Sequence, residues 1–286
     1  MHAFRIFPLA ALLPALPLAL AVWTQQAAAP PLPEIHQLMR EVEEHQKQLD
    51  KVRENYTYTS LQTTQDMDAN GQVKKTETRE WEEFFVNSHQ VARMVKKDGR
   101  PLTDEEQQKE TERVTKAVEK AQQPDPEKPK EGNNVTLSQL LEIMEASHPR
   151  REVFRGRPAI VIDFAGRKDA KTHGLQEDMS KKLQGTIWID EADRQIVHLD
   201  VVFDDDFHIA GGLVANVQKG SNFHFDQALI NGEIWLPTGV DGTVSLRLLL
   251  VKGIRQHFTE RDSDYKRFRV ETEQGKDAKA VAEKKQ

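Results

Sequence analysis

The 286-residue chain contains no cysteine. This absence excludes a disulfide-stabilised scaffold, a thiolate metal site, a cysteine nucleophile and a lipid anchor carried on cysteine. The chain also lacks a strong excess of either charge, since 40 basic residues face 46 acidic ones. The mild acidic excess, with no segregated basic stripe, argues against nucleic-acid binding. Because disulfides and thiolate metal sites are excluded, packing alone must stabilise the fold.

Signatures of catalysis are missing as well. The sequence has no phosphate-binding glycine loop, no nucleophile elbow, no His-Glu-x-x-His pair and no Gly-x-Gly-x-x-Gly fingerprint. We therefore predict a protein that is not an enzyme, with no catalytic residues, no cofactor and no metal site.

One acidic segment gives a lesser alternative. Asp204–Asp206, followed by Phe207 and His208, can offer carboxylate and imidazole ligands to a cation. Because neighbouring strand residues point to opposite faces, three consecutive aspartates converge only in a loop. A charged turn or sheet edge is the favoured interpretation, and a metal-assisted hydrolase using these aspartates with His208 or His224 is the alternative. We expect His198 and His257 on solvent-facing positions of strands.

The N-terminus is the most apolar part of the chain. Residues 1–29 carry one cation, Arg5, then an uncharged apolar run from Ile6 to Trp23, and end in three alanines. This order is typical of a secretory signal peptide, cleaved after Ala29 or Ala21. A retained anchor is the alternative, which three prolines in the run disfavour. We predict an exported protein, periplasmic or secreted, with no transmembrane segment after cleavage.

The next segment changes its hydrophobic period. Apolar residues at three- and four-residue spacing predict an amphipathic helix over 34–54. From Tyr56 the period is two, and β-branched and aromatic residues predict strands. Asp68–Gly71 is typical of a hairpin turn, and 73–86 and 90–95 continue an antiparallel meander.

A polar excursion over 101–148 follows. Thr103–Glu106 has the capping-box pattern and begins a charged helix that ends near residue 122. Prolines among charges over 122–134 predict a solvated linker, and 136–146 predicts a second short amphipathic helix.

Strands joined by short turns fill the rest of a single domain over 30–270. We expect them at 153–164 (two strands around Gly156), 184–190, 195–203, 211–217, 222–230, 233–237, 243–251 and 255–270, with Asn231-Gly232 and Asp241-Gly242 as turns. The charged tail, 271–286, is predicted to be disordered. This pattern excludes a parallel nucleotide-binding sheet. It predicts an α+β fold: a strongly curved antiparallel sheet, an incomplete barrel, covered by the helices at 34–54 and 136–146.

Apolar residues in these strands gather on one face of the sheet. The rows are Ile187 and Ile189; Val197, Leu199, Val201 and Phe203; Phe223, Phe225 and Leu229; and Val244, Leu246, Leu248 and Leu250. Either the helices cover this face completely, or part of it remains as a cavity for a hydrophobic guest. The candidate ligand-contacting residues are Ile187, Ile189, Leu199, Val201, Phe223, Phe225, Leu246 and Leu248.

Three segments together resemble the LolA-like superfamily of periplasmic proteins, which includes lipoprotein carriers, lipid-binding lipoproteins and envelope-stress regulators. They are the strand Tyr56-Thr57-Tyr58, the hairpin from Gly185-Thr-Ile-Trp188-Ile-Asp190 to Ile196-Val-His-Leu199, and Gly232-Glu-Ile-Trp235-Leu-Pro237. The resemblance covers about 34–100 and 150–270. It implies an incomplete barrel wrapped over helices, with a hydrophobic cavity that takes acyl chains. No gating or ligand residue of the carriers aligns with a position here.

Two functions follow as hypotheses. The first is a carrier or sensor that holds acyl chains of a lipid or lipoprotein in the concave cavity. The second is a structural or regulatory envelope module in which the charged excursion, 101–135, and the tail contact a protein partner, while the apolar face is only core.

Overall fold

The computed structural model describes residues 30–53, 55–87, 89–123, 142–212, 214–248, 252–269 and 281–282. The chain divides into two units, Met1–Pro31 and Leu32–Gln286, and the second is described here. The predicted signal peptide, the proline-rich linker and nearly all of the tail lie outside the described residues.

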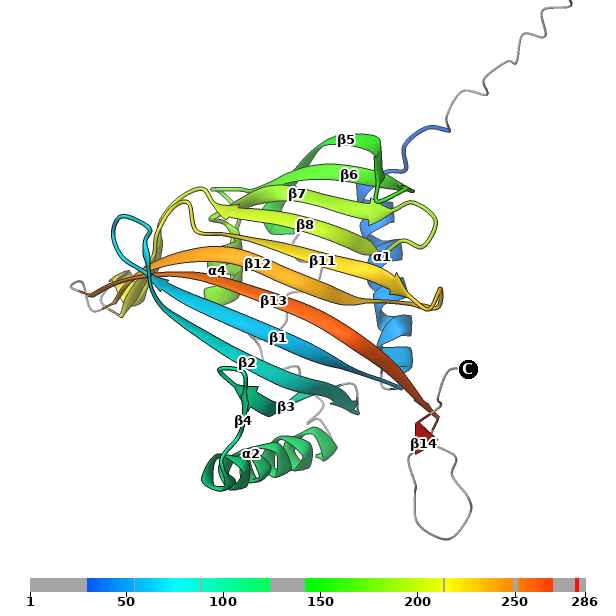
Figure 1. The fold of residues 1–286 in the computed structure, drawn as a ribbon. Coiled ribbons are helices and arrows are strands. Elements are labelled where there is room, and N and C mark those ends of the chain that lie inside the picture. The colour runs from blue at the N-terminus through cyan, green and yellow to red at the C-terminus, as the bar shows by residue number, and fades with distance from the viewer. Residues whose placement is uncertain are drawn as a thin grey trace, which may run out of the picture. The chain divides into compact units, whose positions relative to one another are not determined.

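The described elements follow one another in chain order, and Figure 1 shows their arrangement. They are α1 (Ile35–Arg53), β1 (Tyr56–Met67), β2 (Val73–Val86), β3 (His89–Lys97), β4 (Arg100–Pro101), α2 (Asp104–Gln122), β5 (Met144–Phe154), β6 (Arg157–Gly166), α4 (Leu175–Ser180), β7 (Leu183–Asp190), β8 (Ile196–Phe203), β9 (Phe207–Ile209), the 3-10 turn η1 (Ala210–Gly212), β10 (Ala215–Val217), β11 (Asn222–Ile230), β12 (Ile234–Leu248), β13 (Lys252–Arg269) and β14 (Val281–Ala282).

The strands form one curved antiparallel sheet that is not closed into a barrel (Figure 1). The main path runs β4-β3-β2-β1-β13-β12-β11-β8-β7-β6-β5, so β4 and β5 are its edges. The last long strand, β13, lies between β1 and β12 and joins the N-terminal meander to the C-terminal strands. The predicted fold class is therefore confirmed, including the meander and the turn at Gly71, whose φ is +81°.

Helix α1 covers part of one face of the sheet, which we call the inner face. Its first half packs through Leu38, Met39 and Val42 against Ile160 and Ile162 of β6 and Ile187 and Ile189 of β7. Its second half packs through Leu49 and Val52 against Tyr56, Ile234 and Leu236. The apolar stripe of the predicted helix thus packs on the sheet along its length, most deeply at Leu38, Met39 and Val42, and this contact fixes α1 on the sheet.

The second covering helix ends earlier than predicted. Residues 136–141 lie outside the described part, Glu142 and Ile143 are helical, and Met144–Ala146 belong to β5, which pairs Ala146 with Phe164 of β6. A short apolar run has no periodicity that separates a helix from a buried strand. The crossing after β6 contains a further helix, α4, whose Ser180 is buried.

The predicted turn at Asp241-Gly242 is also wrong, because β12 runs straight through it. A Cβ atom at Gly242 would lie 2.6 Å from the carbonyl oxygen of Asn222 and 2.6 Å from the ring of Phe258. The glycine is needed there for close approach of neighbours and not for a turn.

Val197 leaves the apolar row to which the sequence assigns it. The register between β7 and β8 pairs Trp188 with His198 and Ile189 with Ile196, so Val197 is an extra residue on β8. At such a bulge two residues of one strand lie opposite one residue of its partner, so the alternation of side chains between the two faces shifts by one residue. Ile196 therefore packs on the inner face beside Leu199, and Val197 lines a separate pocket beside Trp235.

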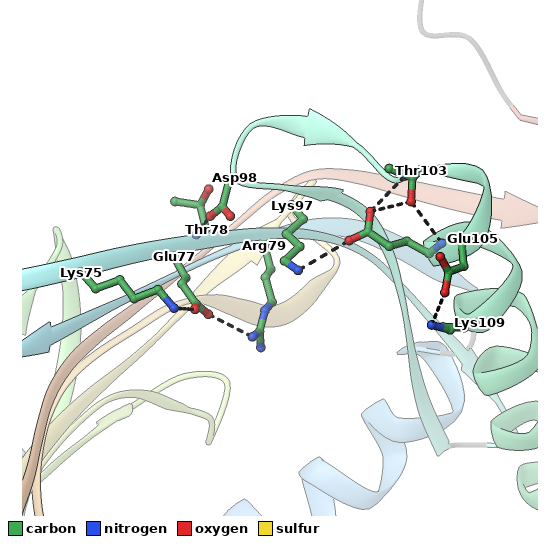
Figure 2. Close-up of polar contacts among 10 residues, drawn as sticks. Lys75, Glu77, Thr78, Arg79, Lys97, Asp98, Thr103, Glu105 and Lys109 are labelled. Carbon is green, nitrogen blue, oxygen red and sulfur yellow. Dashed lines mark hydrogen bonds and ion pairs between the residues drawn. The ribbon is translucent and has the colours of Figure 1, made fainter.

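The predicted capping box at the start of α2 is present. Thr103 Oγ1 accepts a hydrogen bond from the backbone N–H of Glu106 at 3.3 Å, and the Glu106 carboxylate accepts one from the Thr103 N–H at 3.0 Å. Figure 2 shows this cap beside the end of β3, where Lys97 forms an ion pair with Glu106 at 3.5 Å. Within α2 only Glu110 and Ala121 are buried, so the helix depends strongly on its cap.

Thr103→Ala should destabilise α2 by about 1 kcal/mol. Hydrogen exchange of the α2 amides measures this change directly, because local opening is faster than global unfolding. Thr111→Ala is the matched control, since the Thr111 hydroxyl only bonds back to the Gln107 carbonyl and alanine favours the helix interior. Faster exchange in both variants, or in neither, would contradict the role of the cap.

Candidate functional site

An apolar pocket lies on the inner face beside α1. It has a volume of about 230 Å³. Its walls come from α1, α4, the strands β5 to β8, and β11. The lining residues are Ile35, Met39, Met144, Ala146, Ile162, Phe164, Ser180, Leu183, Ile187, Ile196, Leu199, Val201 and Phe223. All of these except Ser180 have apolar side chains, so the pocket suits a ligand that has no polar group to satisfy.

Four of the eight candidate ligand-contacting residues line this pocket: Ile187, Leu199, Val201 and Phe223. Ile189 is fully buried in the core cluster that includes α1. Phe225, Leu246 and Leu248 do not line the pocket. Phe225 pairs with Leu199, and Leu246 and Leu248 pair with β10, so these side chains occupy the same face further along the sheet.

Sequence reasoning missed the walls that come from α1, β5 and β6. Ile35 and Met39 were visible as part of the helical stripe, but their position over β6 and β7 depends on how the helix crosses the sheet. The sequence pattern predicts a helix at Met144 and Ala146, whereas both residues lie in β5. Ile162 ends the apolar run Ala159–Ile162, from which the side of the sheet cannot be inferred, and Phe164 follows it after Asp163.

The inner face becomes acidic beyond β12. Asp262 of β13 pairs with Ser60 of β1, and neither carboxylate oxygen of Asp262 has a hydrogen-bond partner among the described residues. Burial raises the pKa of Asp262 to about 7, and the negative charges of Glu260 and Glu83 raise it as well. Burial also raises the pKa of Glu83, although Gln90 donates a hydrogen bond to its carboxylate. This half of the face is therefore unsuited to hydrocarbon.

The aspartate triplet of the hydrolase alternative forms a charged turn. Asp205 pairs with Lys182 at 2.5 Å, and Asp206 accepts hydrogen bonds from the Lys219 N–H at 2.8 Å and from Asn216 at 3.2 Å. Because protein donors hold both residues, they do not converge on a ligand. His224 lies instead beside Asp200, on the opposite, outer face.

The fold and the pocket define a class: an α+β protein in which an open antiparallel sheet carries a helix and an apolar pocket on one face. Solved structures with a similar fold include a putative outer-membrane lipoprotein-sorting protein domain from Vibrio parahaemolyticus, at 11% identity and a TM-score of 0.32, with 81% of this chain and 94% of that chain covered. A DUF1329 family protein from Desulfovibrio piger gives 10% identity, a TM-score of 0.31, and 79% and 92% coverage. The Pseudomonas aeruginosa MucA/MucB complex matches at 10% identity and a TM-score of 0.24, with 78% of this chain and 94% of that chain covered.

These likenesses concern the fold alone. No family model and no curated protein matches the chain. Within the described part of the chain, no helix is long and apolar enough to cross a membrane.

Proposed function

We propose that the protein binds the hydrocarbon chain of a lipid or lipoprotein in the inner pocket, as a carrier or sensor that acts without catalysis. The observation that supports this most directly is the lining, in which apolar side chains from seven elements converge and Ser180 alone is polar. A pocket of this kind is normally dry, and a hydrocarbon gains free energy by entering it.

The size of the pocket sets what it can hold. By comparison with an engineered cavity of about 150 Å³ that binds benzene, a 230 Å³ pocket takes roughly nine carbon atoms. At about 0.8 kcal/mol per methylene, this burial contributes roughly 7 kcal/mol before the entropy cost of association. The affinity for one chain should therefore reach about 10 µM at best, unless α1 moves to enlarge the pocket.

Ala146→Trp should fill the pocket and weaken the binding of decanoate at least tenfold. Ala146 lies on β5, contacts the core cluster that includes α1, and lines the pocket, so a bulky apolar side chain there occupies the ligand volume without adding charge. Titration calorimetry with decanoate measures the affinity. Native mass spectrometry of protein from a periplasmic expression host detects any lipid that copurifies.

Ala165→Trp is the matched control for this experiment. Ala165 neighbours Phe164 on β6, is exposed, and points to the outer face, so the same substitution leaves the pocket open. Decanoate binding should survive in this variant. If the parent protein shows only the mass of the bare chain and binds no decanoate, the proposed function must be abandoned.

A partner-binding role for 101–135 stays a prediction. The described part of that segment, α2, is anchored to β3 where Glu110 accepts the Met94 N–H at 2.6 Å, and most of its charged side chains are exposed.

A further inference from the structure

Two histidines and two aspartates form a cluster on the outer face of the sheet, opposite the pocket. They come from adjacent antiparallel strands: β8 carries His198 and Asp200, and β11 carries His224 and Asp226. The register places Asp200 opposite His224 and Asp226 opposite His198. Ligand atoms of His198, Asp200 and His224 all lie within 4.8 Å of one another.

The contacts of His198 cannot all be hydrogen bonds of a neutral ring. Its Nδ1 lies 2.7 Å from Asp226 Oδ1, and its Nε2 lies 2.8 Å from Asp200 Oδ1. A neutral imidazole has one N–H, so one of these nitrogens presents a lone pair to a carboxylate oxygen. The same Asp200 oxygen also contacts His224 Nδ1. Either an extra proton or a cation must lie among these atoms to make the arrangement attractive.

His198 is held in place for a ligand role. Its side chain is 16% exposed, stacks on Phe154 with ring centroids 5.2 Å apart, and meets the edge of Trp188 at 4.8 Å. The Asp226 carboxylate accepts a hydrogen bond from His198 Nδ1 and also forms an ion pair with Arg155 at 2.8 Å. A carboxylate on the far nitrogen of a histidine fixes the tautomer and orients the ring, as it does for metal-bound histidines.

We propose that His198 Nε2, an Asp200 carboxylate oxygen and His224 Nδ1 bind a first-row divalent cation of the Zn²⁺ type. Two imidazoles and one carboxylate suit such a cation, whereas Ca²⁺ and Mg²⁺ prefer ligand sets made of oxygen. Tetrahedral bonds of about 2.0–2.1 Å need small rotations of the three side chains. His224 is 47% exposed, so a fourth position faces solvent and takes water or a side chain of another protein.

This proposal departs from the sequence-based expectation of no metal site. Asp200 and His224 are 24 residues apart along the chain, and only the β8–β11 register brings His224 beside the two ligands on β8. It is independent of the lipid proposal, because the cluster and the pocket lie on opposite faces of β8.

The test is a titration of chelator-stripped protein without a polyhistidine tag, using Zn²⁺ in a calorimeter and Co²⁺ in an absorption spectrometer. We expect one equivalent of metal per chain and a Co²⁺ spectrum of tetrahedral type. His224→Ala should weaken binding at least tenfold, and Asp226→Asn should weaken it by about 10- to 100-fold through the orientation of His198.

His208→Ala is the matched control and should leave the affinity unchanged, because His208 is an exposed strand histidine beside the Asp204–Asp206 turn. Circular dichroism checks that each variant folds. Absence of stoichiometric binding in the parent protein overturns the proposal and leaves an extra proton as the explanation of the cluster. Binding that survives in His224→Ala, or disappears in His208→Ala, overturns it equally.

Discussion

Arg157→Met should lower the free energy of unfolding by about 3 kcal/mol at neutral pH, because it leaves a buried carboxylate without its cation. The Asp190 side chain is 2% exposed, and both of its oxygens accept from the Arg157 guanidinium, at 2.5 and 3.0 Å. Burial raises the pKa of the Asp190 carboxyl, but Arg157 and the backbone N–H groups of Asp193 and Ala192 outweigh it, so the pKa lies below its usual value. Urea denaturation of both proteins measures the loss.

The loss in Arg157→Met should shrink as the pH falls, since protonation of Asp190 removes the unpaired charge. Arg151→Met is the control, because Arg151 also forms an ion pair with a carboxylate, that of Glu191, at 2.7 Å. Both side chains are a quarter exposed, so water can replace the lost partner. Its effect should be much smaller. Equal losses in the two variants would show that the burial of Asp190 is not the cause.

Two of the three segments that resemble the LolA-like superfamily, the hairpin from Gly185 to Leu199 and Gly232–Pro237, meet beside this ion pair. Asp190 ends β7 and closes the turn to β8 by accepting the Ala192 and Asp193 N–H groups, while Trp235 Nε1 donates to Asp193 at 2.9 Å. Gly185 has a packing reason too, since a Cβ there would lie 1.9 Å from the Asp200 carbonyl oxygen. These motif residues therefore hold β7, β8 and β12 together, which explains why they indicate the fold and say little about a ligand.

Local signals made much of this fold predictable from the sequence. The stripe of α1, the turn ending at Gly71 and the cap at Thr103 each depend on residues close in the chain. The bulge at Val197 and the straight passage of β12 through Gly242 depend on neighbours distant in the chain. The sequence therefore predicts which strands have an apolar face more reliably than it predicts which residues of different strands contact each other.

The same limit applies to the sites. Four of the eight predicted ligand-contacting residues line the apolar pocket, because alternation along a strand determines which face of the sheet each of its residues occupies. The walls from β5 and α1 required the packing of whole elements. The His198 and His224 cluster required a register between strands separated by a turn and two short strands, and no pattern along the chain encodes that distance.

Asp262→Asn should stabilise the fold at alkaline pH by about 1–3 kcal/mol. In the unfolded chain this carboxyl ionises near pH 4, whereas in the fold its pKa is raised to about 7 by burial. Because the fold binds the proton more tightly than the unfolded chain, the free energy of unfolding of the parent protein should fall as the pH rises from about 4 to about 7. The amide carries no charge and removes that loss. Because Asp262 is only partly shielded from water, the gain in stability is smaller than the whole pKa shift would give.

Urea denaturation of parent and Asp262→Asn at pH 5 and pH 8 is the measurement. The difference between the two proteins should be much smaller at pH 5, where the loss in the parent has only begun, than at pH 8, where it is complete. Asp264→Asn is the control, since Asp264 is exposed on the same strand and its replacement should have the same effect at both pH values. A difference for Asp262→Asn that is equal at the two pH values would show that this carboxyl is ionised in the fold throughout, and that the acidic half of the inner face is open to water.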